Sequence, residues 1–204
     1  MSLETLLIEA QARGFLGPAP VSGHLEHARD LSTALGSFDG RFLDLGSGAG
    51  VPGLVLATLV PTAVGVLLDA QRKRCDFLQD AIASLGLDGR CSVVCGRAEE
   101  LARDPGLRET FDLVVARAFG APATTAECAV GFLSPGGKLA VSEPPGDTAV
   151  PGRWPETGLR ELGLSAPQML RCGAAGVAIM ELGGPTSDRW PRRTGIPAKR
   201  PLWT

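Results

Sequence analysis

The stretch that decides the fold is Asp-Leu-Gly-Ser-Gly-Ala-Gly-Val-Pro-Gly at residues 44–53. It links an apolar strand to a helix through a loop with very little side-chain bulk, so a ligand can approach the backbone closely. Pro52 suits the first turn of a helix, whose free N–H groups would point at a carboxylate or phosphate. A dinucleotide-binding fingerprint needs glycine where this chain has Val51. The loop therefore predicts a cofactor site outside that class, with an ordinary Gly-rich turn as the alternative.

The composition is that of one globular domain. The 204 residues are 44% hydrophobic and 21% charged, enough to bury a sizeable core. Five cysteines without a C-x-x-C pair favour reduced thiols in a cytosolic protein. Glu4 and Glu9 argue against a secretory signal, and the uncharged stretch 45–68 is too rich in Gly and Pro to span a membrane. We expect a cytoplasmic monomer without membrane partners. We also expect no bound metal, since His24 and His27 have no companion ligands nearby.

Strands and helices alternate along the chain, which predicts an α/β fold with a doubly wound, mostly parallel sheet of seven strands and helices on both faces. After the strand that leads into the loop, further strands are expected at 63–69, 91–95, 111–116, 138–142, 168–172 and 177–182. Helices are expected at 3–13, 24–35, 54–60, 72–85, 99–103 and 124–133. A Pro/Gly-rich irregular loop follows Glu143. Residues 1–36 form an N-terminal helical cap, 37–188 the main domain and 189–204 a basic tail.

Three candidate ligand positions follow the predicted strands, where ligands bind in open α/β sheets. Asp69 can accept two hydrogen bonds from the ribose hydroxyls of a nucleoside. Ala98 and Glu99 can frame an adenine ring and its amino group, although a solvated helix start is the alternative for Glu99. Arg117 places a cation in the crevice, with a surface salt bridge as its alternative.

The glycine loop, with Asp44 two residues before its first glycine, resembles the first motif of class I S-adenosylmethionine (SAM) methyltransferases. That resemblance implies SAM as the cofactor and a Rossmann-like methyltransferase domain over residues 37–188. The cofactor-binding residues expected from it are Asp44, Gly46, Ser47, Gly48, Gly50, Val51, Asp69, Ala98, Glu99 and Arg117.

The motifs that are absent from the sequence limit the choice of methyl acceptor. Ala116–Phe119 is no Asn/Asp-Pro-Pro-aromatic motif for exocyclic base amines, and neither Cys95 nor Cys128 lies in a Pro-Cys context that suggests a nucleophile. Both histidines lie upstream of the cofactor loop, which disfavours a histidine base for O-methylation. Guanine N7 has an exposed lone pair and loses no proton, so proximity and charge placement can supply most of the rate.

Charge is unevenly distributed. Residues 189–204 carry five basic side chains and no acid, which leaves 15 basic and 22 acidic residues elsewhere, a balance of −7. With Trp190 and Trp203 interleaved, this segment can contact phosphates and stack on bases, while a solvated tail is the alternative. The RNA-binding candidates are Arg189, Arg192, Arg193, Lys199 and Arg200.

Together these landmarks resemble the small-subunit ribosomal-RNA methyltransferase G family, also called GidB, over roughly residues 24–201. The motifs that carry the resemblance are 44–53, Asp69, 72–78, 96–100, 117–119 and Pro-Arg-Arg-Thr-Gly-Ile-Pro at 191–197. The resemblance implies methylation of guanine N7 in 16S rRNA, with the small-subunit rRNA or 30S particle as partner. It also implies that Arg117 is the catalytic residue and faces both cofactor and substrate.

The sequence departs from the family at Glu143, where a lysine and glycine are usual after the fifth strand. An anion there should oppose RNA binding. Two other functions therefore stay open: a SAM methyltransferase for a small molecule, and a ribosome-assembly factor that keeps the fold but transfers no methyl group.

Overall fold

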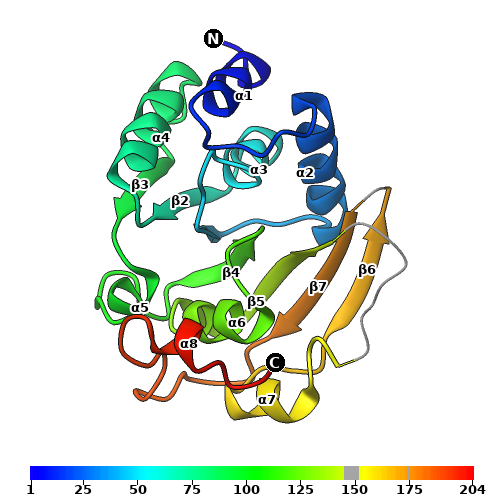
Figure 1. Ribbon diagram of the computed structural model, residues 1–204, viewed down its shortest axis with the longest axis vertical. Coiled ribbons are helices and arrows are strands. Elements are labelled where there is room, and N and C mark those ends of the chain that lie inside the picture. The colour runs from blue at the N-terminus through cyan, green and yellow to red at the C-terminus, as the bar shows by residue number, and fades with distance from the viewer. Residues whose placement is uncertain (145–151, 174) are drawn as a thin grey trace.

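The computed structural model describes residues 1–144, 152–173 and 175–204, and these residues form one sheet of seven strands between two layers of helices (Figure 1). The strand order is β3-β2-β1-β4-β5-β7-β6, parallel from β3 to β5, with β7 and β6 antiparallel. The strands are β1 (Arg41–Leu45), β2 (Val64–Asp69), β3 (Cys91–Cys95), β4 (Phe111–Ala116), β5 (Leu133–Glu143), β6 (Gln168–Cys172) and β7 (Ala175–Glu181). The predicted α/β, doubly wound, mostly parallel sheet is confirmed.

Alternation along the strands builds a core on each face of the sheet. Phe42 and Leu67 point into one core, whereas Leu43 and Leu68 point into the other. The first core is covered by α1 (Leu3–Ala12), α2 (Val21–Leu35), α3 (Gly53–Leu59) and α4 (Arg72–Ser84). On the other face lie α5 (Ala98–Leu101), α6 (Pro122–Val130), α7 (Glu156–Glu161) and α8 (Ile196–Lys199). Both faces of the central strands are therefore buried, as parallel sheets require.

The helix expected at 124–133 is too long. It ends at Val130, and Leu133 already belongs to β5, where it pairs with Phe111 before a register shift. The helical reading failed there because Phe132 and Leu133 continue an apolar run that periodicity alone cannot divide. Helices α7 and α8, of six and four residues, were not predicted. Most of the irregular loop expected after Glu143 lies outside the described residues.

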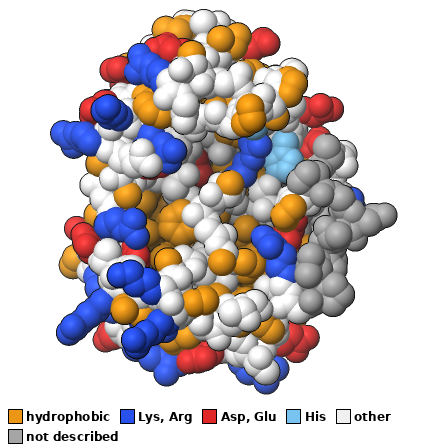
Figure 2. All heavy atoms as spheres, viewed as in Figure 1, with side chains coloured by type: hydrophobic (Ala, Val, Ile, Leu, Met, Phe, Trp, Pro, Cys, Tyr) orange, Lys and Arg blue, Asp and Glu red, His pale blue; other side chains and the backbone are white. Residues whose placement is uncertain are grey.

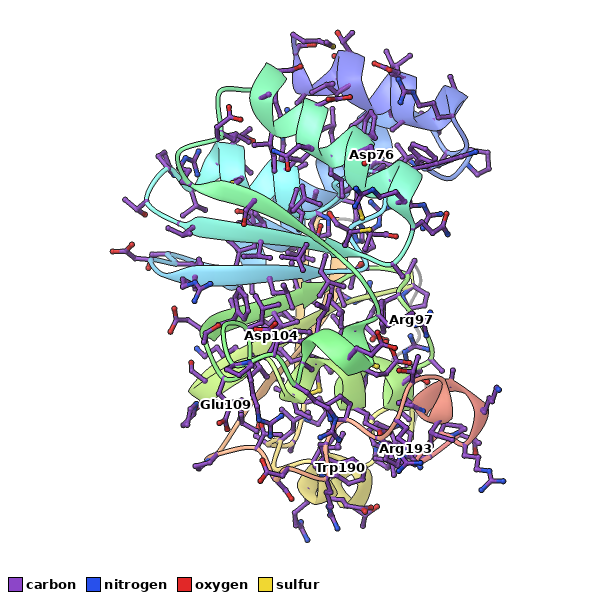
Figure 3. All side chains as sticks on the ribbon, turned by 90° about the vertical axis from the view of Figure 1, so that its left-hand side faces the viewer. Asp76, Arg97, Asp104, Glu109, Trp190 and Arg193 are labelled. Carbon is purple, nitrogen blue, oxygen red and sulfur yellow. The ribbon has the colours of Figure 1, made fainter. Side chains whose placement is uncertain are left out.

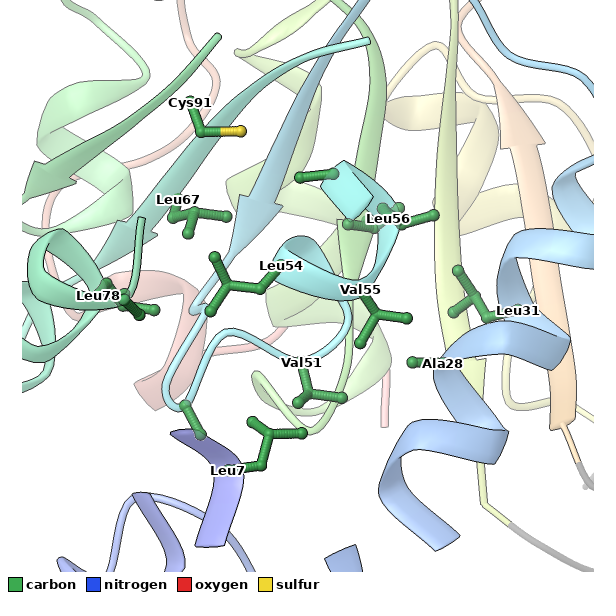
Figure 4. Packing of buried hydrophobic residues seen from close by; sticks show 14 of the residues in the cluster. Leu7, Ala28, Leu31, Val51, Leu54, Val55, Leu56, Leu67, Leu78 and Cys91 are labelled. Carbon is green, nitrogen blue, oxygen red and sulfur yellow. The ribbon is translucent and has the colours of Figure 1, made fainter. Parts of the chain in front are cut away.

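Val51, which is expected to contact the cofactor, has its side chain in the core. It is 7% exposed and lies in the same cluster as Leu7, Ala28 and Val55 (Figure 4). The cofactor loop is thus attached to the N-terminal helices through this apolar side chain. Within the described ranges, no helix is both long and apolar enough to cross a bilayer, and no group of three or more His, Cys, Asp or Glu residues is arranged to hold a metal ion.

Candidate active site at the carboxyl ends of the strands

A cavity of about 460 Å³ opens at the carboxyl ends of the parallel strands. Figure 2 shows the face that contains this hollow, with apolar side chains inside and Lys and Arg side chains along one flank. Its lining comes from the glycine loop, the ends of β2 and β3, the β4–α6 connection and α8: Gly46, Leu68, Asp69, Ala70, Gln71, Arg74, Gly96, Arg97, Ala98, Glu99, Ala118, Phe119, Gly120, Ala121, Thr124, Cys128 and Ala198. The volume is in the range of small-ligand and cofactor sites.

Asp44 and Ser47 hold the glycine loop in its conformation through buried hydrogen bonds. Asp44 Oδ2 accepts hydrogen bonds from Ser47 Oγ at 2.6 Å and from the Gly53 backbone N–H at 2.9 Å. Both side chains are buried, and burial raises the pKa of Asp44 to about 6. Gly46 has a φ of 72° and faces the cavity, and an added Cβ would lie 2.6 Å from Phe119 Cδ2. The side chains of Asp44 and Ser47 are thus hydrogen-bonded inside the protein, and the loop faces the cavity with the backbone of Gly46.

Asp69 links the glycine loop to the adjacent helix. Its Oδ2 accepts from the Gly48 N–H at 2.9 Å, its Oδ1 accepts from the Gln71 N–H at 2.8 Å, and Arg74 Nη1 lies 3.7 Å from Oδ2. The carboxylate is 4% exposed and lines the cavity. Each oxygen can accept more than one hydrogen bond, so this geometry leaves capacity for two ligand hydroxyls.

Glu99 joins the cavity wall to the C-terminal segment. Its Oε1 accepts from the Gly195 N–H at 2.9 Å and from Arg97 Nη2 at 3.0 Å. Burial alone would raise the pKa of this carboxyl, but the N–H donors of Gly195 and Arg97 hold it below its ordinary value. Glu99 is therefore an anion that lines the cavity and fastens residue 195, and the solvated alternative considered for it is wrong because the residue is 4% exposed.

The C-terminal segment is packed against the body of the protein. Arg192 donates to the buried carboxylate of Glu127 from Nε at 2.8 Å and from Nη2 at 2.6 Å, and Ala198 lines the cavity. Arg189 lies 3.6 Å from Glu161 and its guanidinium stacks 4.6 Å from the Trp190 ring. The side chains of Arg193, Lys199 and Arg200 are exposed, and so is that of Arg189. Nε and Nη2 of Arg192 thus bond inside the protein while its side chain is still 28% exposed, and its role in RNA binding stays a prediction.

Figure 3 shows where this packed segment lies relative to the third strand. Arg97, just after β3, projects above the segment that carries Arg193, on the same side of the molecule. Arg97 is exposed on its outer side while it bonds Glu99. Two basic residues far apart in the chain thus lie on the same side of the molecule, and Arg97 also lines the cavity.

Arg117 and the two histidines form a cluster beside the glycine loop. Arg117 Nη2 lies 2.7 Å from His24 Nδ1, and His27 Nε2 lies 2.5 Å from Ser142 Oγ at the end of β5. Burial and the neighbouring Arg117 lower the pKa of His27, and burial also lowers the pKa of Arg117. Both histidines precede the glycine loop in sequence, but α2 brings them next to Arg117 and Ser142 at the strand ends, so their position in the sequence does not disfavour a histidine base.

The residue after Arg117 has an uncommon backbone conformation. Ala118 has a φ of 53°, in the left-handed region that L-residues seldom occupy. The turn directs Arg117 toward α2 and Phe119 into the cavity. Phe119, Thr124 and Cys128 line the cavity without having been predicted to do so, because the helical reading of α6 gave no indication of which face meets a ligand. Burial, with the nearby carboxylates, raises the pKa of the Cys128 thiol, so it is no activated nucleophile.

Glu143 does not present a free anion to a substrate. Its Oε2 lies 2.7 Å from Arg153 Nε, and Trp154 Nε1 donates to Oε1 at 2.9 Å. The carboxylate is 4% exposed. The expectation that Glu143 opposes RNA binding is therefore corrected, because Arg153 neutralises its charge.

The sheet order, the glycine loop and the cavity over Asp69 are those of a class I methyltransferase. In solved structures the same fold occurs in a predicted O-methyltransferase from Agrobacterium tumefaciens, with a TM-score of 0.62 at 16% identity over 78% of this chain and 81% of that one. It also occurs in the mitomycin 7-O-methyltransferase MmcR, with a TM-score of 0.63 at 19% identity over 89% and 60%. A sequence profile of the GidB family, described as rRNA small subunit methyltransferase G, matches residues 21–142. The chain belongs to this family, and it is a SAM-dependent methyltransferase.

Two relatives span most of the chain. A ribosomal RNA small subunit methyltransferase G of Rubrobacter xylanophilus is 38% identical over 87% of this chain and 72% of its own length. A protein of the same name from Syntrophomonas wolfei is 31% identical over 98% of this chain and 97% of its own length. The similarity thus includes the N-terminal helices and the C-terminal segment as well as the glycine loop.

Proposed function

We propose that this protein transfers the methyl group of SAM to N7 of a guanine in the 16S rRNA of the small ribosomal subunit. The observation that carries the proposal is a cofactor-sized cavity that opens beside exposed cationic side chains. The relatives named as ribosomal RNA small subunit methyltransferases support the choice of substrate. We place the protein in the cytoplasm as a monomer that meets ribosomal particles there.

The cavity fits SAM by the chemistry of its walls. We assign the ribose hydroxyls to Asp69, the adenine to the segment Gly96–Glu99, and the close backbone approach to Gly46. We assign structural roles to Asp44 and Ser47, which keep the loop in shape, and to Val51, Gly48 and Gly50, which set its path. When bound, SAM supplies a methyl group activated by its sulfonium charge. Asp69 and Glu99 supply two buried carboxylates close to that cationic ligand.

The acceptor chemistry is one that these residues can support by positioning. Guanine N7 loses no proton on methylation, so the site has to align the base and exclude water. Phe119 offers an aromatic face at the cavity, and Arg117 offers N–H donors next to the loop. We propose that Phe119 stacks on the base and that Arg117 orients the reactants, which makes Arg117 the catalytic residue.

A basic rim beside the cavity accounts for RNA affinity in this proposal. Arg97, Arg193, Lys199 and Arg200 are exposed, and the first two lie on one side of the molecule (Figure 3). Exposed guanidinium and ammonium groups neutralise phosphates and release counterions. Arg189 is partly engaged by Glu161, so we assign it a weaker contribution.

The test is methyl transfer from labelled SAM to small ribosomal subunits that lack the modification, followed by digestion and identification of the labelled nucleoside. Labelled 7-methylguanosine is the expected product. Label on another nucleoside would refute the N7 assignment. Tight binding to the subunits without any SAM affinity would indicate an assembly factor instead.

A second candidate is methylation of a small-molecule hydroxyl, favoured by the position of His27. Its imidazole is half-buried, its pKa is lowered by burial and by Arg117, and it contacts Ser142 Oγ. A neutral imidazole at that place can accept a proton from an acceptor hydroxyl. Substituting the exposed basic residues distinguishes the two candidate functions. Removing the charges of Arg193, Lys199 and Arg200 should weaken RNA methylation and leave a small-molecule reaction unchanged.

A further inference from the structure

We infer that His24 is a positioning residue, which holds the Arg117 guanidinium so that its Nη1 is left as the donor for an oxygen atom of a bound ligand. This inference rests on the proposed function. It gives a role to a histidine that sequence analysis set aside.

The hydrogen-bond chemistry of Arg117 fixes the state of His24. A guanidinium only donates, so His24 Nδ1, 2.7 Å from Arg117 Nη2, must be the acceptor. The ring proton is then on Nε2, which lies 3.2 Å from the Gly17 carbonyl oxygen and donates to it. Gln11 Nε2 donates to the same oxygen at 2.6 Å. A chain of hydrogen bonds therefore runs from the α1–α2 connection to Arg117.

Burial restricts the movement of the side chains in this series of hydrogen bonds. His24 is 7% exposed within the first turn of α2, so its ring has little freedom to turn away. Arg117 Nη1 is buried and has no hydrogen-bond partner among the described residues. A buried donor without a partner is costly and calls for an explanation. Because Nη2 is hydrogen-bonded to His24, the guanidinium has a fixed orientation. Its Nη1 is then available to donate to a bound ligand.

The chemistry of that ligand atom is an oxygen acceptor, since an N–H donor on a cation prefers a carboxylate or carbonyl oxygen. Two bound groups can supply it. The cofactor brings a carboxylate, and guanine brings O6 next to the N7 that receives the methyl group. The two sources differ in which binding step weakens when Arg117 is released.

The test compares two substitutions of His24. His24→Phe keeps the ring shape but removes the acceptor, whereas His24→Asn keeps an acceptor atom near the position of Nδ1. We expect His24→Phe to lower kcat/KM for methyl transfer on the order of 10–100-fold, as misplaced catalytic groups do. His24→Asn should recover most of that loss. Glu26→Gln, an exposed change on the same helix, serves as the control and should match the parent protein.

The Kd for SAM and the KM for RNA of the His24→Phe variant show which group supplies the oxygen. A weaker Kd for SAM measured without RNA identifies the cofactor carboxylate. An unchanged Kd for SAM with a higher KM for RNA identifies the base oxygen. Parent-like efficiency in His24→Phe would overturn the inference, and so would His24→Asn failing as badly as His24→Phe at equal thermal stability.

A second measurement needs no methyl transfer. The chain has only two histidines, so long-range nitrogen-proton NMR spectra of histidine-labelled protein give two ring systems. The expected spectrum has His24 with a bare Nδ1 and a protonated Nε2, and Arg117→Met should abolish that fixed tautomer. A protonated Nδ1 in the parent protein would refute the inference even if rRNA methylation is confirmed. Conversely, the expected tautomer with no label on RNA would leave the inference standing and refute the proposed function.

Discussion

Arg192 bonds the fully buried carboxylate of Glu127 through two side-chain donors, and its backbone N–H donates to the same group at 2.9 Å. This is the tightest link between the C-terminal segment and α6. The next residue, Arg193, is exposed. Adjacent arginines thus have opposite surroundings, which gives a matched pair for experiment.

We predict that Arg192→Ala lowers the free energy of unfolding by about 3 kcal/mol, because it leaves a buried carboxylate without its partner. SAM affinity should fall as well, since the segment that carries Ala198 is no longer fastened to the cavity. Denaturant titration and calorimetry measure the two effects. Arg193→Ala should leave the free energy of unfolding unchanged, and equal destabilisation by both substitutions would contradict the assignment.

Gly46→Ala should weaken SAM binding on the order of 10-fold or more, because Gly46 has positive φ and its new methyl group would collide with Phe119. Gly48→Ala isolates the backbone strain, since a Cβ there would be no closer than 3.7 Å to the Phe15 carbonyl oxygen, an ordinary van der Waals contact. The double substitution Gly46→Ala with Phe119→Ala should recover the part of the loss due to collision. No recovery would show that strain alone is responsible.

Arg117→Ala should lower methyl transfer at least about 100-fold while the thermal midpoint stays within a few degrees, because the residue is half-buried and acts by orientation. Arg117→Lys should restore little, since one ammonium cannot bond His24 and a ligand in the same planar geometry. Single-turnover assays with small subunits measure both. Full activity in Arg117→Ala would refute its catalytic assignment.

Asp44 makes stability depend on pH in a predictable direction. Its folded-state pKa of about 6 lies above the ordinary 3.8, so the folded protein binds the proton more tightly than the unfolded chain. That stabilisation is fully present below about pH 4 and is lost as the pH rises through about 6, amounting to about 2–3 kcal/mol. In Asp44→Asn this fall should vanish. The measurement is the difference in unfolding free energy between parent and variant from pH 4 to 8, and a constant difference would be the contrary result.

The basic rim predicts a change in salt dependence. Replacing Arg193, Lys199 and Arg200 by alanine should reduce RNA affinity and lower the slope of log affinity against log salt by about 2, at roughly 0.7 per lost contact to single-stranded RNA. Binding titrations at several salt concentrations measure it. An unchanged slope would mean that these side chains do not touch phosphates.

The sequence supported the fold well because its signals were local. The apolar strands, the glycine loop and Asp69 each depend on neighbours within a few residues, and alternating strands and helices predict a mostly parallel sheet. The boundary between α6 and β5 failed because both elements are apolar there. The positions of Gly46, Asp69, Ala98 and Glu99 around one cavity were predictable for the same reason.

The remaining site features depend on contacts between distant parts of the chain. Arg117 meets His24 across 93 positions, and Gly195 meets Glu99 across 96. No local pattern encodes such a contact, so the histidines were set aside and the bond between Arg192 and Glu127 was not predicted.

The wall contributed by Ala198 has a consequence for biosynthesis. A nascent chain that has been translated as far as β7 already has all its strands, yet it lacks one side of the cofactor cavity. Residues 192–198 must leave the exit tunnel before that side can close against Glu99 and Glu127. An emerging chain whose residues 192–198 have not yet left the tunnel therefore has an incomplete cofactor cavity.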